Sequence, residues 1–470
     1  MSRPSTLGEL KSSGWESQSV KEELRSNAVE LIRSGADLFP GVQGYDDTVI
    51  PQVENALLAG HDIIFLGERG QAKTRMMRAL VDVLDEYLPV VAGSEINDDP
   101  YHPASKFARD LVAEMGDDTP IDWLHRSRRF GEKLATPDTS IADLIGEVDP
   151  IKVAEGRYLS DELTLHYGLV PRTNRGIFAI NELPDLSERI QVGLLNILEE
   201  RDVQVRGYKI QLPVDIVLVA SANPEDYTNR GRIITPLKDR FGSQVRTHYP
   251  LEVDLEREIA IQEATVFDTD GLTTDVPEFM ATIVATLSHQ ARESAHINQR
   301  SGVSVRLSVA NYEALVAGAA RRTLLAGEDH VVPRVSDLGA LTSATTGKVE
   351  IETLEEGRDG EIVEHLIRGA VLTVFKDTVD PAAHRAVLDA FDEGAVVSAG
   401  DDIASADYVA LLEQIPALTS VLENLGFDEG SMAQPAMVAA GVEFVLEGLH
   451  LNKRLNKEAV AGAGVYRARA

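Results

Sequence analysis

Short apolar runs alternate with amphipathic stretches along the first half of the chain. Five of these runs are bounded by turn residues and are typical of strands buried on both faces of a parallel sheet: 61–68, 88–93, 176–181, 216–223 and 244–250. Apolar side chains recur every three or four residues and predict helices at 18–35, from about Thr74 onward, and at 187–200. Strands that alternate with helices predict an α/β fold, a parallel sheet with helices on both faces.

The second half of the chain has a helical period instead of strand-like runs. From Asp254 to about Gly327 the apolar positions recur at helical spacing, and the same spacing returns toward the end of the chain. The acidic stretch 350–364 contains two glycines and is a candidate linker. We therefore expect four parts: an N-terminal helical segment at 1–38, an α/β domain at 39–253, a helical domain at 254–349, and an acidic linker with a helical C-terminal region at 350–470.

Two stretches of the first half depart from the simple alternation. Residues 97–175 are polar, rich in prolines and charges, and predict no simply periodic element. Residues 202–215 alternate in polarity around Arg206-Gly207, which predicts a β-hairpin.

Charge and composition narrow the possible partners. The chain has 470 residues, with 45 Lys and Arg against 76 Asp and Glu, and a formal net charge of -31. Such an acidic surface repels nucleic acids and anionic membranes, and the short basic stretch 125–129 is expected to be a solvated face. The absence of cysteine excludes disulfides and thiolate zinc sites. No apolar run approaches twenty residues, so we expect a cytoplasmic protein that does not enter a membrane.

Residues 67–74, GERGQAKT, join an apolar strand to an amphipathic helix. They match the phosphate-binding loop G-x-x-x-x-G-K-[ST] except at Ala72. The two glycines give the turn its freedom, and Ala72 is expected to approach helical angles, which alanine adopts at no cost. Lys73 would reach the β- and γ-phosphates, and Thr74 would hold Mg²⁺ through its hydroxyl. The predicted nucleotide-binding residues are Gly67, Glu68, Arg69, Gly70, Gln71, Ala72, Lys73 and Thr74.

A phosphate loop also needs a group near the metal ion and a base that polarises water. Asn181 and Glu182 stand at the carboxyl end of the run 176–181, where such sites form. Glu182 is placed to act as the base. Asn181 occupies a position where aspartate is usual; its carbonyl can accept from a Mg²⁺-bound water but brings no charge, so metal affinity or turnover is expected to be lower.

Two further side chains complete the expected site. Asn223, at the end of the fourth run, could hold the attacking water, although a strand that ends in Asn-Pro is also ordinary turn chemistry. Arg240 precedes the last run and could stabilise γ-phosphate charge from a neighbouring subunit. An ion pair with Asp239 is the alternative for Arg240, and Arg230 and Arg232 are rival arginines.

Taken together, these motifs resemble those of AAA+ ATPases in the MoxR and magnesium-chelatase I-subunit group. The resemblance covers roughly residues 39–310. It is carried by 67-GERGQAKT-74, 168-GLVPRTNRGIFAINEL-183, 202-DVQVRGYKIQLPVD-215, 219-VASANPEDYTNRG-231, 238-KDRF-241 and 302-GVSVR-306. Ala72 before Lys73 is similar to the MoxR form of the loop, whereas 168–176 is more similar to the chelatase form.

The resemblance implies an ATP- and Mg²⁺-dependent ATPase and assigns its residues. The implied roles are nucleotide and Mg²⁺ binding for Lys73 and Thr74, the second Walker motif for Asn181 and Glu182, sensor one for Asn223, the arginine finger for Arg240, and sensor two for Arg306. The part at 39–253 would then be the nucleotide-binding domain, and the part at 254–349 would be the helical lid that carries Arg306. The family also implies a homo-oligomeric, hexameric ring with the nucleotide between subunits. Its members usually act on a partner with a von Willebrand factor A domain, here a separate chain, because the tail lacks a D-x-S-x-S motif.

Four functions remain open at this point. The first is an ATPase motor that remodels a partner protein, and the second is a nucleotide-gated scaffold with little turnover, which Asn181 favours. The third is the motor subunit of a magnesium chelatase. The fourth is a transcription activator for the alternative sigma factor, whose G-A-F-T-G-A loop this sequence lacks.

Overall fold

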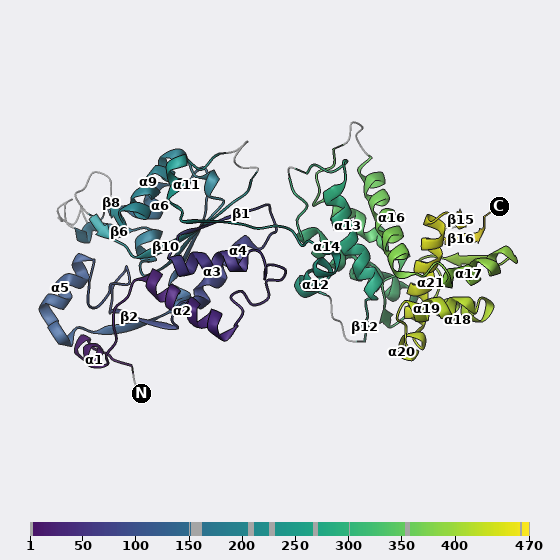
Figure 1. Ribbon diagram of the computed structural model, residues 1–470, viewed down its shortest axis with the longest axis horizontal. Helices are drawn as coiled ribbons and strands as arrows, with labels where there is room; N and C mark the ends of the chain where they lie inside the picture. Colours follow the sequence, from purple (N-terminus) through teal and green to yellow (C-terminus); the bar gives the residue numbers. More distant parts are fainter. Residues whose placement is uncertain are drawn as a thin grey trace. The chain divides into compact units, whose positions relative to one another are not determined.

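The chain forms two compact units, Met1–His248 and Tyr249–Ala470, and each is described by itself (Figure 1). The computed structural model describes residues 3–149, 151, 162–204, 211–224, 231–266, 271–299, 301–352, 358–460 and 463–469. Among the helices in these ranges, none has both the length and the apolarity that crossing a bilayer requires. The division of the chain into four parts stays a prediction.

The first unit is built on a five-stranded parallel sheet. Its strand order is β11 (Ser243–Arg246), β1 (Ile63–Leu66), β10 (Ile216–Ala222), β7 (Gly176–Asn181) and β4 (Phe130–Leu134). Strand β1 pairs with β10, the central strand, on one side and with β11 on the other, both in parallel. Four of the five predicted runs lie in this sheet, and the predicted α/β class is confirmed.

Successive residues of the central strands enter two different cores, one on each face of the sheet. Ile64 of β1 and Leu218 of β10 pack in the core that contains helix α9 (Glu188–Glu199) and helix α11 (Thr235–Arg240). Ile63 and Val219 pack in the core that contains α2 (Val20–Ser34), α3 (Ile50–Ala59) and α4 (Lys73–Ala79). Burial on both faces explains the continuous apolar runs. The predicted helices at 18–35 and 187–200 are confirmed.

One prediction about the sheet was wrong, and one strand was not predicted. The run 88–93 does not join the parallel sheet, because β2 (Tyr87–Val91) pairs antiparallel with β3 (Ile121–His125) in a separate sheet. The missing edge strand is β4, which pairs with β7 and comes from the stretch 97–175 that predicted no simple element. An edge strand has one neighbour, and the residues of β4 are half-buried or exposed. Such a strand does not need an apolar run, so the sequence pattern does not reveal it.

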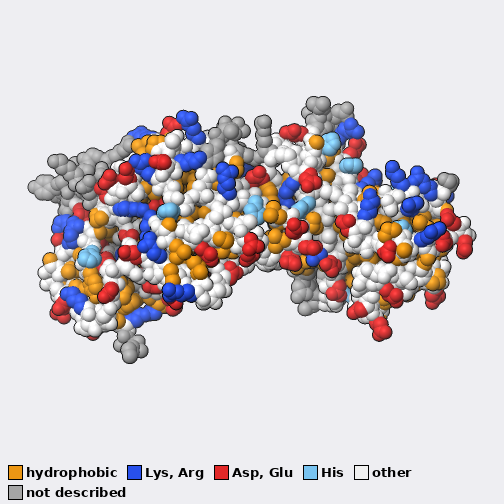
Figure 2. Space-filling view, in the orientation of Figure 1, with side chains coloured by type: hydrophobic (Ala, Val, Ile, Leu, Met, Phe, Trp, Pro, Cys, Tyr) orange, Lys and Arg blue, Asp and Glu red, His pale blue; other side chains and the backbone are white. Residues whose placement is uncertain are grey.

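The basic stretch 125–129 is not the uniformly solvated face that was expected. The side chain of Arg129 is 0% exposed, and its guanidinium donates to both carboxylate oxygens of Glu23 at 2.6 and 2.5 Å. Its Nε donates to the backbone oxygen of Arg175. This buried pair ties α2 to the start of β4. On the face drawn in Figure 2, acidic and basic side chains are interspersed over the surface of this unit.

The predicted hairpin has both of its arms. Strand β8 (Asp202–Gln204) pairs antiparallel with β9 (Gln211–Pro213), with Val203 opposite Leu212. The turn around Arg206-Gly207 lies outside the described residues. The hairpin prediction is therefore confirmed for its strands.

The second unit is mainly helical, as the periodicity predicts. Its helices are α12 (Val253–Glu263), α13 (Glu278–Glu293), α14 (Arg306–Ala326), α15 (Leu341–Thr346), α16 (Asp359–Thr378), α17 (Ala383–Asp392), α18 (Ser405–Gln414), α19 (Ala417–Asn424), α20 (Glu429–Met432) and α21 (Pro435–Leu451). One hydrophobic core extends from Phe279 to Tyr466 along the sequence, and α21 is buried along almost its whole length.

The C-terminal region also contains a small sheet that the sequence did not predict. Strand β16 (Ala463–Ala468) lies between β14 (Val397–Ala399) and β15 (Leu455–Val460), and both pairs are antiparallel. Strand β14 has only three residues, and β15 and β16 carry exposed charged residues, so their apolar pattern is weak.

Candidate functional site

The loop between β1 and α4 wraps around the side chain of its own lysine. Lys73 is only 7% exposed. Its Nζ donates to the backbone oxygens of Gly67 at 2.5 Å and Glu68 at 2.7 Å. A third bond, of 2.8 Å, goes to Oδ1 of Asn223 just after β10. These contacts fix the ammonium group at the carboxyl end of the parallel sheet, where ligand sites form in such folds.

Ala72 does not have the helical angles that were predicted for it. Its φ is 54° and its ψ is 11°, which is the left-handed region. That conformation costs a residue with a Cβ about 1–2 kcal/mol, whereas glycine adopts it freely. The usual loop pattern therefore has glycine at this position because the backbone is left-handed there. Alanine adopts the same conformation here with strain.

Tyr45 and Thr247, which lie outside the loop sequence, hydrogen-bond to Gln71 of the loop. The hydroxyl of Tyr45 lies 3.1 Å from the backbone oxygen of Gln71 and 2.8 Å from that of His248. Burial raises the pKa of Tyr45, so this hydroxyl stays a donor. Thr247 donates to Oε1 of Gln71 at 2.6 Å. A Cβ at Gly67 would lie 1.9 Å from the Thr247 hydroxyl oxygen, so only glycine fits this packing.

Asn223 connects the lysine of the loop with the predicted base. Its Oδ1 accepts from Lys73, and its Nδ2 donates to Oε2 of Glu182 at 2.6 Å. The two residues meet because β10 and β7 are adjacent parallel strands and both side chains follow the strand ends. The backbone of Glu182 is also left-handed, with φ 55°, and its N–H donates to the hydroxyl of Ser221. Strain of this kind is typical of functional positions.

Thr74 and Asn181 form a second chain of polar contacts beside the first. The Thr74 hydroxyl donates to Oδ1 of Asn181 at 3.0 Å. Nδ2 of Asn181 donates to Oε1 of Glu132 at 2.6 Å. Glu132, from β4, also accepts from Nε and Nη2 of Arg78 at 2.8 and 2.9 Å. The predicted metal-binding pair therefore has a carboxylate next to it that the sequence did not point to.

Arg240, the predicted arginine finger, forms an ion pair with Glu199 and not with Asp239. Arg240 donates through Nε and Nη2 to Oε2 of Glu199 on α9, at 2.8 and 2.6 Å, and its side chain is 31% exposed. The pair with Asp239 is not the one formed. Among the rival arginines, Arg232 is exposed, and Arg230 lies outside the described residues.

The predicted sensor-two residue, Arg306, belongs to the second unit. It is the exposed first residue of α14. The structure thus brings the loop, Asn181, Glu182 and Asn223 together, while the roles of Arg240 and Arg306 stay predictions.

The gathered groups suit a nucleotide and a magnesium ion. Mg²⁺ prefers oxygen ligands, and Thr74, Asn181 and Glu132 present a hydroxyl, an amide oxygen and a carboxylate at one place. Gly70, with φ 75°, and Ala72 give the loop the left-handed turns that point backbone N–H groups at an anion. Within the described ranges, no group of three or more His, Cys, Asp and Glu could hold a metal ion.

Several supporting residues were not predicted from the sequence. Glu132 lies on an edge strand without an apolar run, and Tyr45 and Thr247 lie outside the loop motif. The sequence carries no local signal for any of the three. Ser221 stands inside the quoted stretch 219–231, and its place two residues before Asn223 puts it on the same strand end.

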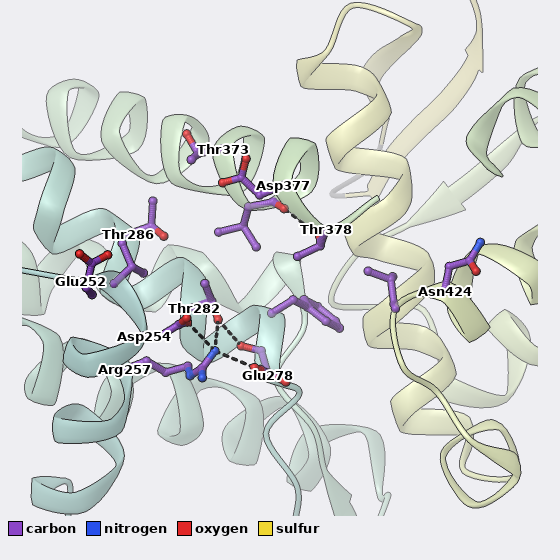
Figure 3. A pocket seen from close by; sticks show the side chains of 14 residues that line it. Glu252, Asp254, Arg257, Glu278, Thr282, Thr286, Thr373, Asp377, Thr378 and Asn424 are labelled. Carbon is purple, nitrogen blue, oxygen red and sulfur yellow. Dashed lines mark hydrogen bonds and ion pairs between the residues drawn. The ribbon is translucent and has the colours of Figure 1, made fainter. Parts of the chain in front are cut away.

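The second unit contains a cavity of about 520 Å³ between α12, α13 and α16 (Figure 3). Its charged lining residues are Glu252, Asp254, Arg257, Glu278 and Asp377. Arg257 donates to Glu278 at 2.7 Å and pairs with Asp254 at 3.1 Å. None of the predicted site residues lines this cavity.

Comparison with known protein families gives sequence matches over much of the chain. The Sigma-54 interaction domain family matches residues 154–240. Magnesium-chelatase subunit ChlI of Nephroselmis olivacea is 28% identical over 331 residues, which cover 65% of this chain and 86% of that protein. The ChlI subunit of Anabaena variabilis is 29% identical over 217 residues, which cover 44% of this chain and 58% of that protein. Among solved structures, the complex between subunits BchI and BchD of magnesium chelatase contains a chain that is 21% identical, with a TM-score of 0.36; the match covers 70% of this chain and 98% of that one.

The parallel sheet, the phosphate-binding loop and the sequence matches define the class of a P-loop nucleotide-binding protein. The sequence matches show that the chain is similar to AAA+ ATPases of the group that includes the magnesium-chelatase I subunits. This confirms the resemblance drawn from the motifs, whereas the closer likeness of the loop to MoxR proteins stays a prediction.

Proposed function

We propose that the chain binds ATP with Mg²⁺ and hydrolyses it. The observation that carries the proposal is the direct connection of Lys73, Asn223 and Glu182 by hydrogen bonds of 2.8 and 2.6 Å. A phosphate-binding cation, a polar amide and a carboxylate base thus share one edge of the sheet. Phosphoryl transfer needs such positioning and charge stabilisation more than covalent chemistry.

Each residue has a definite task in this mechanism. Lys73 stabilises charge on the β- and γ-phosphates, Asn223 orients the attacking water, and Glu182 accepts its proton. Thr74 and Asn181 would hold Mg²⁺, Asn181 through a metal-bound water, and the ion would neutralise charge on the phosphate oxygens. Because Asn181 is uncharged, turnover is expected to be slower than with an aspartate at this position.

The proposal also includes the oligomeric state of the chain and the kind of protein on which it acts. The resemblance supports a hexameric ring in which Arg240 reaches the γ-phosphate bound by the neighbouring subunit. Arg240 would then leave Glu199, its partner in the isolated chain. Arg306 in the lid would couple the nucleotide to movement, and the ring would remodel a separate protein with a von Willebrand factor A domain.

Two other functions have specific support. The uncharged Asn181 favours a nucleotide-gated scaffold that assembles with ATP and turns over little. The relatives named as ChlI subunits, at 28% and 29% identity, favour the motor subunit of a magnesium chelatase. A transcription activator is not favoured despite the Sigma-54 interaction domain match, since the sequence lacks the G-A-F-T-G-A loop.

Nucleotide binding is the first test. With a fluorescent ATP analogue, Lys73→Ala is expected to weaken affinity about tenfold or more, the value of one charge-assisted hydrogen bond. Lys11→Ala is the control, because Lys11 pairs with Asp117 at the surface. Thermal unfolding of both variants shows that they are folded, and chromatography with and without ATP measures assembly. Equal affinity in wild type and folded Lys73→Ala would contradict the proposed site.

A further inference from the structure

Glu132 brings a carboxylate into contact with the uncharged residue of the predicted metal site. Its Oε1 lies 2.6 Å from Nδ2 of Asn181, and its side chain is 24% exposed. The two residues come from neighbouring parallel strands, and β4 pairs with β7 so that Leu134 stands opposite Asn181. Glu132, two residues earlier on β4, is on the same face of the sheet as Leu134.

The contact fixes which way the amide of Asn181 points. A carboxylate only accepts hydrogen bonds, so the NH₂ group of Asn181 must face Glu132. The amide oxygen then faces the hydroxyls of Thr74 and Ser221, at 3.0 and 3.4 Å. Without Glu132 the amide could turn over and present donors toward the metal position, which would repel a cation.

The contact also supplies the charge that Asn181 lacks. An aspartate at this position would bring one negative charge, and Glu132 brings one through the adjacent side chain. Arg78 partly offsets that charge, but its side chain is 62% exposed, so solvent weakens its interaction with Glu132. Outer carboxylates that hold a ligand in place commonly change metal affinity by a factor of ten or more.

We propose that Glu132 is a positioning residue for the magnesium site, which orients Asn181 and supplies the negative charge that this residue does not carry. The proposal rests on the proposed function, since it assumes that Mg²⁺ binds with ATP beside Thr74. In this arrangement Glu132 brings to the metal site the negative charge that an aspartate would bring, from one side chain farther away. The chain therefore keeps its Mg²⁺ requirement despite the asparagine.

The experiment is a Mg²⁺ titration of the full chain with a fluorescent ATP analogue. The measured quantities are the Mg²⁺ concentration at half-saturation, the affinity without Mg²⁺, and the rise in melting temperature that Mg²⁺ adds. Glu132→Gln is expected to raise the half-saturating Mg²⁺ concentration about tenfold without weakening the affinity that is measured in the absence of Mg²⁺. The double variant Glu132→Gln with Asn181→Asp moves the charge to the other side of the same hydrogen bond. It is expected to return the half-saturating Mg²⁺ concentration toward the wild-type value.

A structural role for the ion pair predicts a different pattern. If only the ion pair between Glu132 and Arg78 mattered, Arg78→Ala would raise the half-saturating Mg²⁺ concentration as Glu132→Gln does. Our proposal expects Arg78→Ala to leave this concentration unchanged or to lower it. The proposal is overturned if the half-saturating Mg²⁺ concentration of Glu132→Gln equals that of wild type, or if Arg78→Ala raises it as much as Glu132→Gln does. It is also overturned if the double variant keeps the raised value of Glu132→Gln. Wild-type chain that binds no ATP analogue would instead refute the proposed function, and this inference with it.

Discussion

The buried pair of Arg129 and Glu23 predicts a large stability effect. The side chains are 0% and 2% exposed, so replacing Glu23 with leucine leaves a guanidinium without its counter-charge inside the protein. The substitution also removes the acceptor of the Asp85 N–H, which donates to Glu23 at 2.8 Å. Breaking a buried pair by removing one partner costs about 3–5 kcal/mol. For a unit of this size the melting temperature should fall by roughly 6–20 °C.

A double-mutant cycle by thermal unfolding tests this reasoning. Glu23→Leu and Arg129→Met are each expected to destabilise the first unit strongly. The double variant should be much closer to wild type, because two apolar side chains of similar volume replace both charges. Arg126→Met is the matched control from the same basic stretch; its pair with Asp82 is partly exposed, and its loss should cost below about 1 kcal/mol. Single losses below about 1 kcal/mol, or a double loss equal to their sum, would refute the account.

Three further predictions concern the loop and the second unit. Ala72→Gly should stabilise the chain by about 0.5–1 kcal/mol, because relief of the left-handed strain exceeds the entropy gained by the unfolded chain; a lower melting temperature would contradict the strained conformation. Gly67→Ala should abolish tight binding of an ATP analogue, because the Cβ collides with the side chains behind the loop; retained affinity would show that the loop can shift. Burial alone raises the pKa of Glu256, but hydrogen bonds from His289 and Arg292 outweigh it and hold the pKa below its ordinary value. The stability from this carboxylate is complete above the unfolded pKa and is lost as the pH falls through the lower folded pKa. Denaturation at a series of pH values below about 5 should therefore show a smaller acid loss for Glu256→Gln than for wild type, and equal losses would contradict the assignment.

The sequence predicted the centre of the sheet well because physical constraints there are strong. Strand β7 spans 176–181, as the apolar run indicated, because a strand covered on both faces must be apolar throughout. Helix α2 ends at Gly35, whose φ of 65° is the left-handed cap that a glycine stop predicts. The loop, Asn181, Glu182 and Asn223 follow strand ends, and adjacent parallel strands bring such residues together.

What the sequence did not predict depends on contacts between distant segments. The edge strand β4 pairs on one side only, so no apolar run marks it, and Glu132 was missed with it. The left-handed angles of Ala72 come from closure of the loop around Lys73, which the helical propensity of alanine does not reveal. Arg129 was expected in water because its neighbours in sequence are basic, yet its partner Glu23 lies on α2, far away along the chain.

The most direct test of the central claim is steady-state ATP turnover of the purified chain with Mg²⁺, measured beside Glu182→Gln. The account predicts measurable turnover in wild type that falls by a factor of about 10²–10⁴ when the base is removed, with binding of the ATP analogue retained. Wild-type turnover no higher than that of Glu182→Gln, in a chain that still binds ATP, would contradict the hydrolytic mechanism. The nucleotide-gated scaffold would then be the favoured function.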